Sequence, residues 1–113
     1  MNTAREALKN FGPKGERWGK EFYNEDGLMC SIGSVLDVKG LLAVDAHRLY
    51  EDPEVQYLAE VIATEYPEYE VTLTGHGRDV MDTIYTFNDA DTTKFRDIER
   101  VFEKTAVWID EKV

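Results

Sequence analysis

The stretch Asp26-Gly-Leu-Met-Cys-Ser-Ile-Gly-Ser-Val-Leu-Asp37 predicts the packing on which the fold depends. Its larger apolar residues recur at helical intervals and share one helix face: Leu28, Ile32, Val35 and Leu36. The neighbouring face is kept thin by small residues: Cys30, Ser31, Gly33 and Ser34. Glycine inside a helix costs about 1 kcal/mol relative to alanine, so Gly33 is best explained by a segment packed close against the backbone. We therefore predict a slender helix that begins near Leu28 and ends at Lys39-Gly40.

Cys30 is the only cysteine of the chain, and it falls in the first turn of this predicted helix. Unpaired backbone N–H groups and the helix dipole would stabilise a thiolate there, so a nucleophile is one interpretation. A nucleophile also needs a base within hydrogen-bond reach, and the only histidines, His47 and His76, stand in no known cysteine-hydrolase context. Because Met29 and Ile32 add apolar bulk around the sulfur, we favour an inert thiol packed in the core.

The N-terminal side of this stretch predicts a short helix followed by an extended segment. Thr3 and Glu6 have the spacing of a capping box, and Gly12-Pro13 would stop the helix that they begin. Apolar and polar residues then alternate with a period of two over residues 17–22, which suggests a short strand.

The C-terminal side predicts three more helices. Asp52-Pro53 places an N-cap carboxylate before a proline at the first helical position, and Pro67 would end that helix. Residues 70–74 have β-branched character and suggest a second short strand. The apolar stripes of the three helices are Val55, Leu58, Ala59, Ile62 and Tyr66; Val80, Met81, Ile84 and Phe87; and Phe95, Ile98, Phe102, Ala106 and Ile109.

The last of these helices, with Asp91 or Thr92 as its expected cap, is apolar on a second face as well. Val101 and Trp108 fall outside its main stripe at a spacing of seven residues. That second face is either deeply buried or half of an interface, and we expect a dimer contact through it. The sequence as a whole predicts one domain over residues 1–113, a mainly α fold of four to five helices with one short hairpin or strand pair.

The charge balance limits the partners that the chain can bind. Its 23 acidic and 13 basic residues give a net charge of -10, which repels phosphate backbones and anionic lipid heads. We therefore expect no direct nucleic-acid or membrane binding, although an acidic surface could imitate DNA toward a DNA-binding protein. The N-terminal residues lack the apolar core of a secretion signal, and a single cysteine forms no disulfide within the chain, so the expected location is the cytoplasm.

Two loops are candidates for a ligand-binding site. Gly75, His76, Gly77 and Arg78 lie where a possible strand passes into a helix, and such a helix start offers N–H groups to an anion. The spacing matches neither the dinucleotide fingerprint nor the P-loop, so a plain turn is the alternative. Asn88-Asp89 either caps backbone groups in its own turn or faces the thin side of the Cys30 helix and lines a polar pocket. No pair of potential ligands has metal-site spacing, and we predict no metal or cofactor.

Several elements of the chain together resemble one known group of proteins. They are, in order, Trp18, the turn Asp26-Gly27, the segment Cys30-Ser-Ile-Gly33-Ser34, the element Phe87-Asn88-Asp89, and Thr92 before an amphipathic helix that contains Ala106. This order is similar to that of a domain of unknown function in small actinobacterial and actinophage proteins, which has a Gly-Trp element, a Gly-x-x-Cys-x-x-Gly-Ala helix and a Trp-Asn-Asp turn. The likeness spans roughly residues 4 to 110, with a poorly matched middle from about 40 to 80.

The chain departs from that pattern at three positions. Ser34 stands where the pattern has alanine, Phe87 where it has tryptophan, and Arg17 where it has glycine. These changes keep the size class at Ser34 and Phe87, so a packing role carries over better than a detailed site. The resemblance implies a bacterial or phage origin and a helical domain, without a reaction, and draws attention to Cys30 and Asn88 together with Gly33 and Asp89.

Three functions remain open from the sequence. We favour a non-enzymatic accessory or interaction protein, whose acidic surface and doubly apolar last helix serve contacts with a protein partner or a second copy. The first alternative is a protein that binds a small anionic, nucleotide-like ligand through the loop from Gly75 to Asp79 and the Asn88-Asp89 turn, with Cys30 as a further binding residue. The second alternative is a cysteine-dependent enzyme that uses Cys30.

Overall fold

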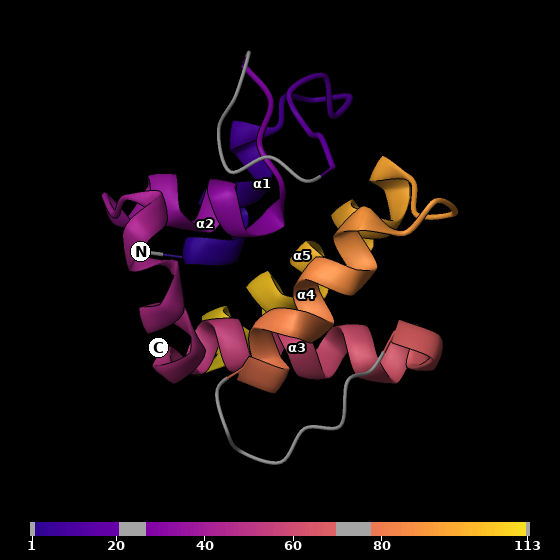
Figure 1. Ribbon diagram of the computed structural model, residues 1–113. Coiled ribbons are helices and arrows are strands. Elements are labelled where there is room, and N and C mark those ends of the chain that lie inside the picture. The colour runs from indigo at the N-terminus through magenta and orange to yellow at the C-terminus, as the bar shows by residue number, and fades with distance from the viewer. Residues whose placement is uncertain (1, 21–26, 70–77, 113) are drawn as a thin grey trace.

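The computed structural model describes residues 2–20, 27–69 and 78–112, and most of these residues are helical (Figure 1). This part of the chain contains five α-helices and two short 3-10 helices: α1 (Thr3–Asn10), α2 (Ser31–Lys39), η1 (Ala43–Glu51), α3 (Pro53–Glu65), η2 (Pro67–Tyr69), α4 (Arg78–Asp89) and α5 (Phe95–Lys112). The predicted mainly α fold is confirmed. None of the helices described is long and apolar enough to cross a membrane.

The predicted strand pair is reduced to one contact in the described residues. A single parallel bridge joins Trp18 to Met29, with Gly19 N donating to Met29 O at 2.9 Å and Met29 N to Arg17 O at 2.8 Å. Residues 21 and 22, the end of the predicted strand, lie outside the described residues. The strand expected at residues 70–74 lies outside the described residues.

Two of the predicted helix caps are wrong, and in both cases the expected side chain is used elsewhere. Asn2 caps α1, because its Oδ1 accepts a hydrogen bond from Arg5 N at 3.0 Å. Thr3 is the first residue of the helix itself, and its Oγ1 donates to Glu54 of α3 at 2.8 Å. Helix α5 begins at Phe95, beyond both predicted caps, and Thr92 Oγ1 is hydrogen-bonded to the hydroxyl of Tyr69 instead.

The caps on either side of the α2–α3 connection agree better with the sequence. Gly40 ends α2 in the left-handed conformation, with φ of 69°, where glycine has no side chain to clash. Asp52 caps α3 by accepting from Glu54 N at 2.8 Å, and Pro53 is the first helical residue, as predicted. The start of α2 is shifted, because the helix begins at Ser31 and Cys30 is its N-cap.

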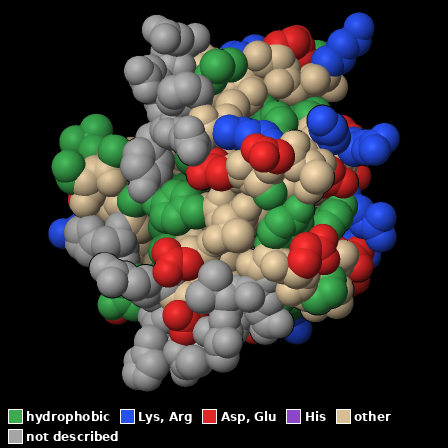
Figure 2. Space-filling model, turned by 45° about the vertical axis from the view of Figure 1, so that its right-hand side comes forward, with side chains coloured by type: hydrophobic (Ala, Val, Ile, Leu, Met, Phe, Trp, Pro, Cys, Tyr) green, Lys and Arg blue, Asp and Glu red, His purple; other side chains and the backbone are tan. Residues whose placement is uncertain are grey.

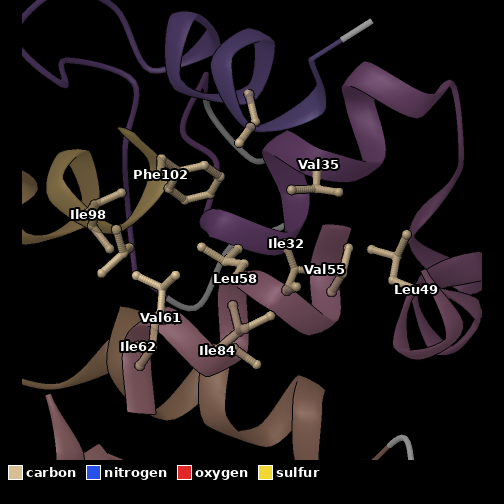
Figure 3. Close-up of a cluster of buried hydrophobic side chains, with 14 of the residues drawn as sticks. Ile32, Val35, Leu49, Val55, Leu58, Val61, Ile62, Ile84, Ile98 and Phe102 are labelled. Carbon is tan, nitrogen blue, oxygen red and sulfur yellow. The ribbon is translucent and has the colours of Figure 1, made fainter. Parts of the chain in front are cut away.

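Helix α3 lies in the middle of the hydrophobic core. Figure 3 shows its side chains Val55, Leu58 and Ile62 among residues of α2, α4 and α5. The largest fully buried apolar side chains are Phe11, Ile32, Leu49, Val55, Ile62, Ile84, Phe87, Ile98, Val101 and Phe102. The residues of the three predicted C-terminal stripes are buried or packed against this core, which agrees with the periodicity of the sequence.

Helix α1 packs against the Ser34 part of the thin face of α2, where the small residues predicted a close neighbour. Ser34 is fully buried, and its Oγ donates to the backbone oxygen of Ala7 at 2.6 Å. Ala4 and Ala7 present equally small side chains from α1. A serine hydroxyl reaches the backbone of a neighbouring helix only where no bulky side chain separates the two helices. Close packing therefore explains why Ser34, Ala4 and Ala7 are small.

The second apolar face of α5 divides between the core and the surface. Val101 is fully buried, whereas Trp108 is partly exposed and stacks on Tyr57 of α3. The ring centroids are 4.2 Å apart and the rings are 10° from parallel. One half of the predicted second face is therefore core, and only the half nearer the C-terminus of α5 reaches solvent.

Candidate functional site

A buried amide, Asn88, holds together three segments that are distant in the sequence. Its side chain lies near the end of α4 and is 1% exposed. Asn88 Oδ1 accepts hydrogen bonds from Trp18 Nε1 at 2.8 Å, from Ser31 N at 2.9 Å and from Ser31 Oγ at 2.7 Å. Asn88 Nδ2 donates to Gly19 O at 3.2 Å and to Asp89 Oδ1 at 2.9 Å. We call these five residues the Asn88 cluster.

The direction of the Asn88 side chain separates the two interpretations of the Asn88-Asp89 turn. The amide faces the start of α2, so it is more than a local turn former. Protein groups occupy its acceptor oxygen and both of its N–H donors, which is the full hydrogen-bonding capacity of an asparagine side chain. In this arrangement the Asn88 side chain links three segments of the fold and presents no free polar atom to a ligand.

Cys30 lies beside this cluster as a buried N-cap. Its side chain is 4% exposed, and Sγ accepts a hydrogen bond from Gly33 N at 3.3 Å. Burial raises the pKa of the Cys30 thiol, and the hydrogen bonds from the Gly33 and Ile32 backbone N–H groups oppose that rise without cancelling it. The negative charge of Asp89 raises the pKa further. The helix start therefore acts on the sulfur as the sequence suggested, but desolvation is the larger effect.

The glycine-rich loop of the predicted anion site cannot be placed. Gly75, His76 and Gly77 lie outside the described residues, and Arg78 is described only as the first residue of α4, without its side chain. His47 belongs to η1, and its side chain is likewise not described. Among the side chains that are described, no three His, Cys, Asp or Glu residues are grouped to hold a metal ion.

A second region lies on the surface between α3 and α5, and the sequence predicted only its α5 side. Two adjoining hollows of about 220 and 470 Å³ lie there, and both are lined by Tyr57 and Lys104. Val107, beside the stacked pair of Tyr57 and Trp108, is 55% exposed. We call this surface the α3–α5 face and define it by Tyr57, Glu60, Glu103, Val107, Trp108 and Glu111.

Positive charge at one end of the α3–α5 face is held by a single carboxylate. Glu65 of α3 forms ion pairs with Lys104 and, at 3.1 Å, with Arg100, both from α5. The hydrogen bond from Lys104 and then the one from Arg100 lower the pKa of the Glu65 carboxyl below its usual value. Glu65 thus remains ionised at neutral pH and keeps both cations directed toward α3.

Two carboxylates lie on the same ridge as Val107, and a third cation, Lys112, lies over the Trp108 ring at 5.7 Å from its centroid. Glu103 and Glu111 lie four residues before and four residues after Val107, so all three share one ridge of α5. Both carboxylates are exposed, and within the described part of the chain neither has an ion-pair partner. Figure 2 shows another view of the surface, where Lys and Arg side chains gather toward one edge and acidic side chains are scattered among apolar patches.

Comparison with known proteins gives no match: no family model matches the sequence, and no curated protein or solved structure matches the chain. The geometry is therefore the basis for assigning a site. Sequence reasoning singled out Trp108 but missed its partner Tyr57. The available signal was helical spacing, because Tyr57 and Val61 are four residues apart on a side of α3 next to its main stripe.

Proposed function

We propose that this protein is a non-enzymatic interaction protein that binds a protein partner through the α3–α5 face. The observation that carries the proposal is the partly exposed stack of Tyr57 on Trp108, with the exposed Val107 beside it and two hollows that Tyr57 lines. Aromatic side chains are enriched in the centres of protein interfaces, where they supply contact area at a low cost in side-chain entropy. Hollows beside such a pair offer space for the side chains of a partner.

The hydrogen bonding of Asn88 and the protonation of Cys30 support an interaction role over catalysis. The amide of Asn88 is bonded to protein groups, and the raised pKa of the Cys30 thiol keeps it protonated near neutral pH. A cysteine-dependent enzyme needs an accessible thiolate, so the buried Cys30 weighs against that alternative.

Four other sequence-based predictions are not tested by the described part of the chain. Binding of a small anion depends on Gly75 to Arg78, where the side chains are not described. The resemblance to the actinobacterial and actinophage domain, the bacterial or phage origin and the cytoplasmic location remain predictions.

The proposal is tested by capture of a partner from a bacterial lysate with matched surface variants. Val107→Glu replaces the exposed apolar residue of the α3–α5 face, and Leu42→Glu makes the same kind of change at a side chain that is 70% exposed before η1. We expect a partner that the wild type and Leu42→Glu retain equally and that Val107→Glu loses. Equal retention by Val107→Glu and the wild type would show that the α3–α5 face is not the binding surface.

A further inference from the structure

We infer that the partner of the α3–α5 face contributes a basic amphipathic helix, with apolar side chains directed at Val107 and Trp108 and Lys or Arg residues on its flanks. This inference rests on the function proposed above, and it adds the chemistry of the partner. It follows from the shape of the face, from the sign of its free charge, and from the charge of the whole chain.

The shape of the face suits a helix better than a single inserted side chain. Its lining residues on α5 run from Arg100 to Glu111 along one side of the helix, a length of about 16 Å at the ordinary helical rise. Tyr57 of α3 lines the same hollow, and Glu60 of α3 lines the adjoining one. A hollowed surface about three turns long can accept the apolar side of another helix.

The apolar centre of the groove determines where the partner is anchored. Val107 is the most exposed apolar residue of α5, and it borders the 470 Å³ hollow together with Trp108 and Tyr57. A leucine or phenylalanine of the partner would remove these side chains from water, and apolar burial of this kind supplies most of the binding free energy in such interfaces.

The charges around this centre determine the sign of the flanking residues. The cations of the face make contacts within the chain: Lys104 and Arg100 are paired with Glu65, and Lys112 lies over the Trp108 ring at 5.7 Å from its centroid. Glu103 and Glu111 carry charges without an ion-pair partner in the described structure, and they flank Val107 on the same ridge. Lys or Arg side chains of a partner would complement these carboxylates, whereas acidic side chains would be repelled.

The net charge of -10 favours the same partner over a second copy of the chain. Two copies repel each other at long range, and so do this chain and any strongly acidic partner. A basic segment is instead attracted before contact, which increases its rate of association.

The first experiment selects helical peptides of 16 residues, with randomised sequences, on the immobilised full-length protein. A parallel selection uses the Val107→Glu variant, so that peptides bound elsewhere are subtracted. We expect peptides that depend on Val107 to carry a net positive charge and an apolar stripe with helical spacing. Enrichment of acidic or neutral peptides that depend on Val107 would overturn the basic partner and leave the proposed function standing.

The second experiment separates the sign of charge from the loss of apolar surface. Val107→Glu and Val107→Lys both remove the isopropyl group at an exposed position, and they place opposite charges there. For a selected peptide, we expect Val107→Lys to weaken binding about tenfold more than Val107→Glu, as measured by fluorescence anisotropy. Equal binding by the two variants, or stronger binding by Val107→Lys, would overturn the inference. Unchanged binding by both would overturn the proposed function as well.

The third experiment removes the two carboxylates one at a time. Glu103→Gln and Glu111→Gln should each weaken the peptide about two- to fivefold at low salt and less at high salt, as exposed ion pairs do. Asp91→Asn is the control, because Asp91 is exposed in the turn before α5 and lies outside the face. Equal effects at Asp91 and at the two glutamates would point to the net charge alone and contradict a directed basic helix.

Concentration-dependent dimerisation that Val107→Lys abolishes would identify a second copy as the occupant and would also overturn the inference.

Discussion

The Asn88 cluster and the α3–α5 face use side chains in opposite ways. In the cluster, polar groups of the kind found in active sites are buried and bonded to each other, from Trp18 Nε1 to the amide of Asn88. At the face, large apolar groups of the kind found in cores are partly exposed, including Trp108 and Val107. The residue types alone would assign chemistry to the first region and packing to the second. Burial reverses that assignment.

The energetic reason for the difference is the environment of each group. A buried polar atom without a partner costs about 1 to 3 kcal/mol, so Asn88 contributes stability by satisfying several donors at once. An apolar side chain that stays exposed, such as Val107, contributes little stability to its own fold, but it offers apolar area to a partner. Changes in the cluster should therefore alter folding, and changes at the face should alter binding.

The largest expected effect is that of Asn88→Ala. Removal of the Asn88 amide leaves Trp18 Nε1 and both donors of Ser31 without their acceptor in a buried site. The free energy of unfolding should therefore fall by about 3 to 4 kcal/mol. Urea denaturation followed by circular dichroism measures this change. Asn10→Ala is the control, because within the described residues the Asn10 side chain bonds only the exposed Asp37, and it should cost less than about 1 kcal/mol. Similar losses for both variants would show that the cluster has no special role in stability.

The next effect concerns the close packing of α1 on α2. Ser34→Leu should destabilise the fold by about 2 to 3 kcal/mol, because the larger side chain must displace the backbone at Ala7. Ser34→Ala fits the space and loses only the hydrogen bond to Ala7 O, so its cost should be about 1 kcal/mol. Thermal and urea denaturation would compare the two variants. A Leu variant as stable as the Ala variant would mean that the two helices are not in tight contact.

The reactivity of Cys30 tests whether the thiol belongs to the folded core. In the native protein, iodoacetamide should modify Cys30 at least about a hundredfold more slowly than in denaturant, because the thiol is buried and protonated. Mass spectrometry of the intact protein gives both rates. Rapid modification of the native protein at neutral pH would contradict this prediction and restore the enzyme alternative.

The same thiol gives a pH dependence with a defined sign. Because the pKa of Cys30 is raised in the folded state, the unfolded chain loses this proton first as the pH rises. The contribution of Cys30 to stability is therefore present below the ordinary thiol pKa and declines as the pH rises from that value toward the raised one. Cys30→Ser should reduce this alkaline decline in a series of urea titrations at increasing pH.

The smallest expected effect on stability is at Val107. Val107→Glu and Val107→Lys should each change the free energy of unfolding by no more than about 0.5 kcal/mol, because the side chain is 55% exposed. The same urea titrations measure this, and the two variants should nevertheless differ in partner binding. A large loss of stability would show that Val107 serves the fold, and the contrast between the two regions would then disappear.

Much of the helical architecture was predictable because its signals are local. Asp52-Pro53 and Gly40 mark helix ends through contacts within a few residues, and the apolar stripes reveal which side of each helix is buried. The small residues of α2 predicted close packing, although they could not identify α1 as the neighbour. The caps of α1 and α5 were mispredicted, because Thr3 and Thr92 bond to residues on other elements.

The sequence by itself determined the helical class, the acidic charge, the slender α2 and most of the residues that face the core, since periodicity, composition and short-range capping act within single segments. Tertiary structure alone decided that Asn88 would bond Trp18, 70 residues away, and Ser31, 57 residues away. It also decided that Tyr57 would stack on Trp108 and that Val107 would remain exposed beside them. The physical reason is that hydrogen-bond partners and solvent exposure depend on which helices meet, and a single sequence does not encode those distances locally.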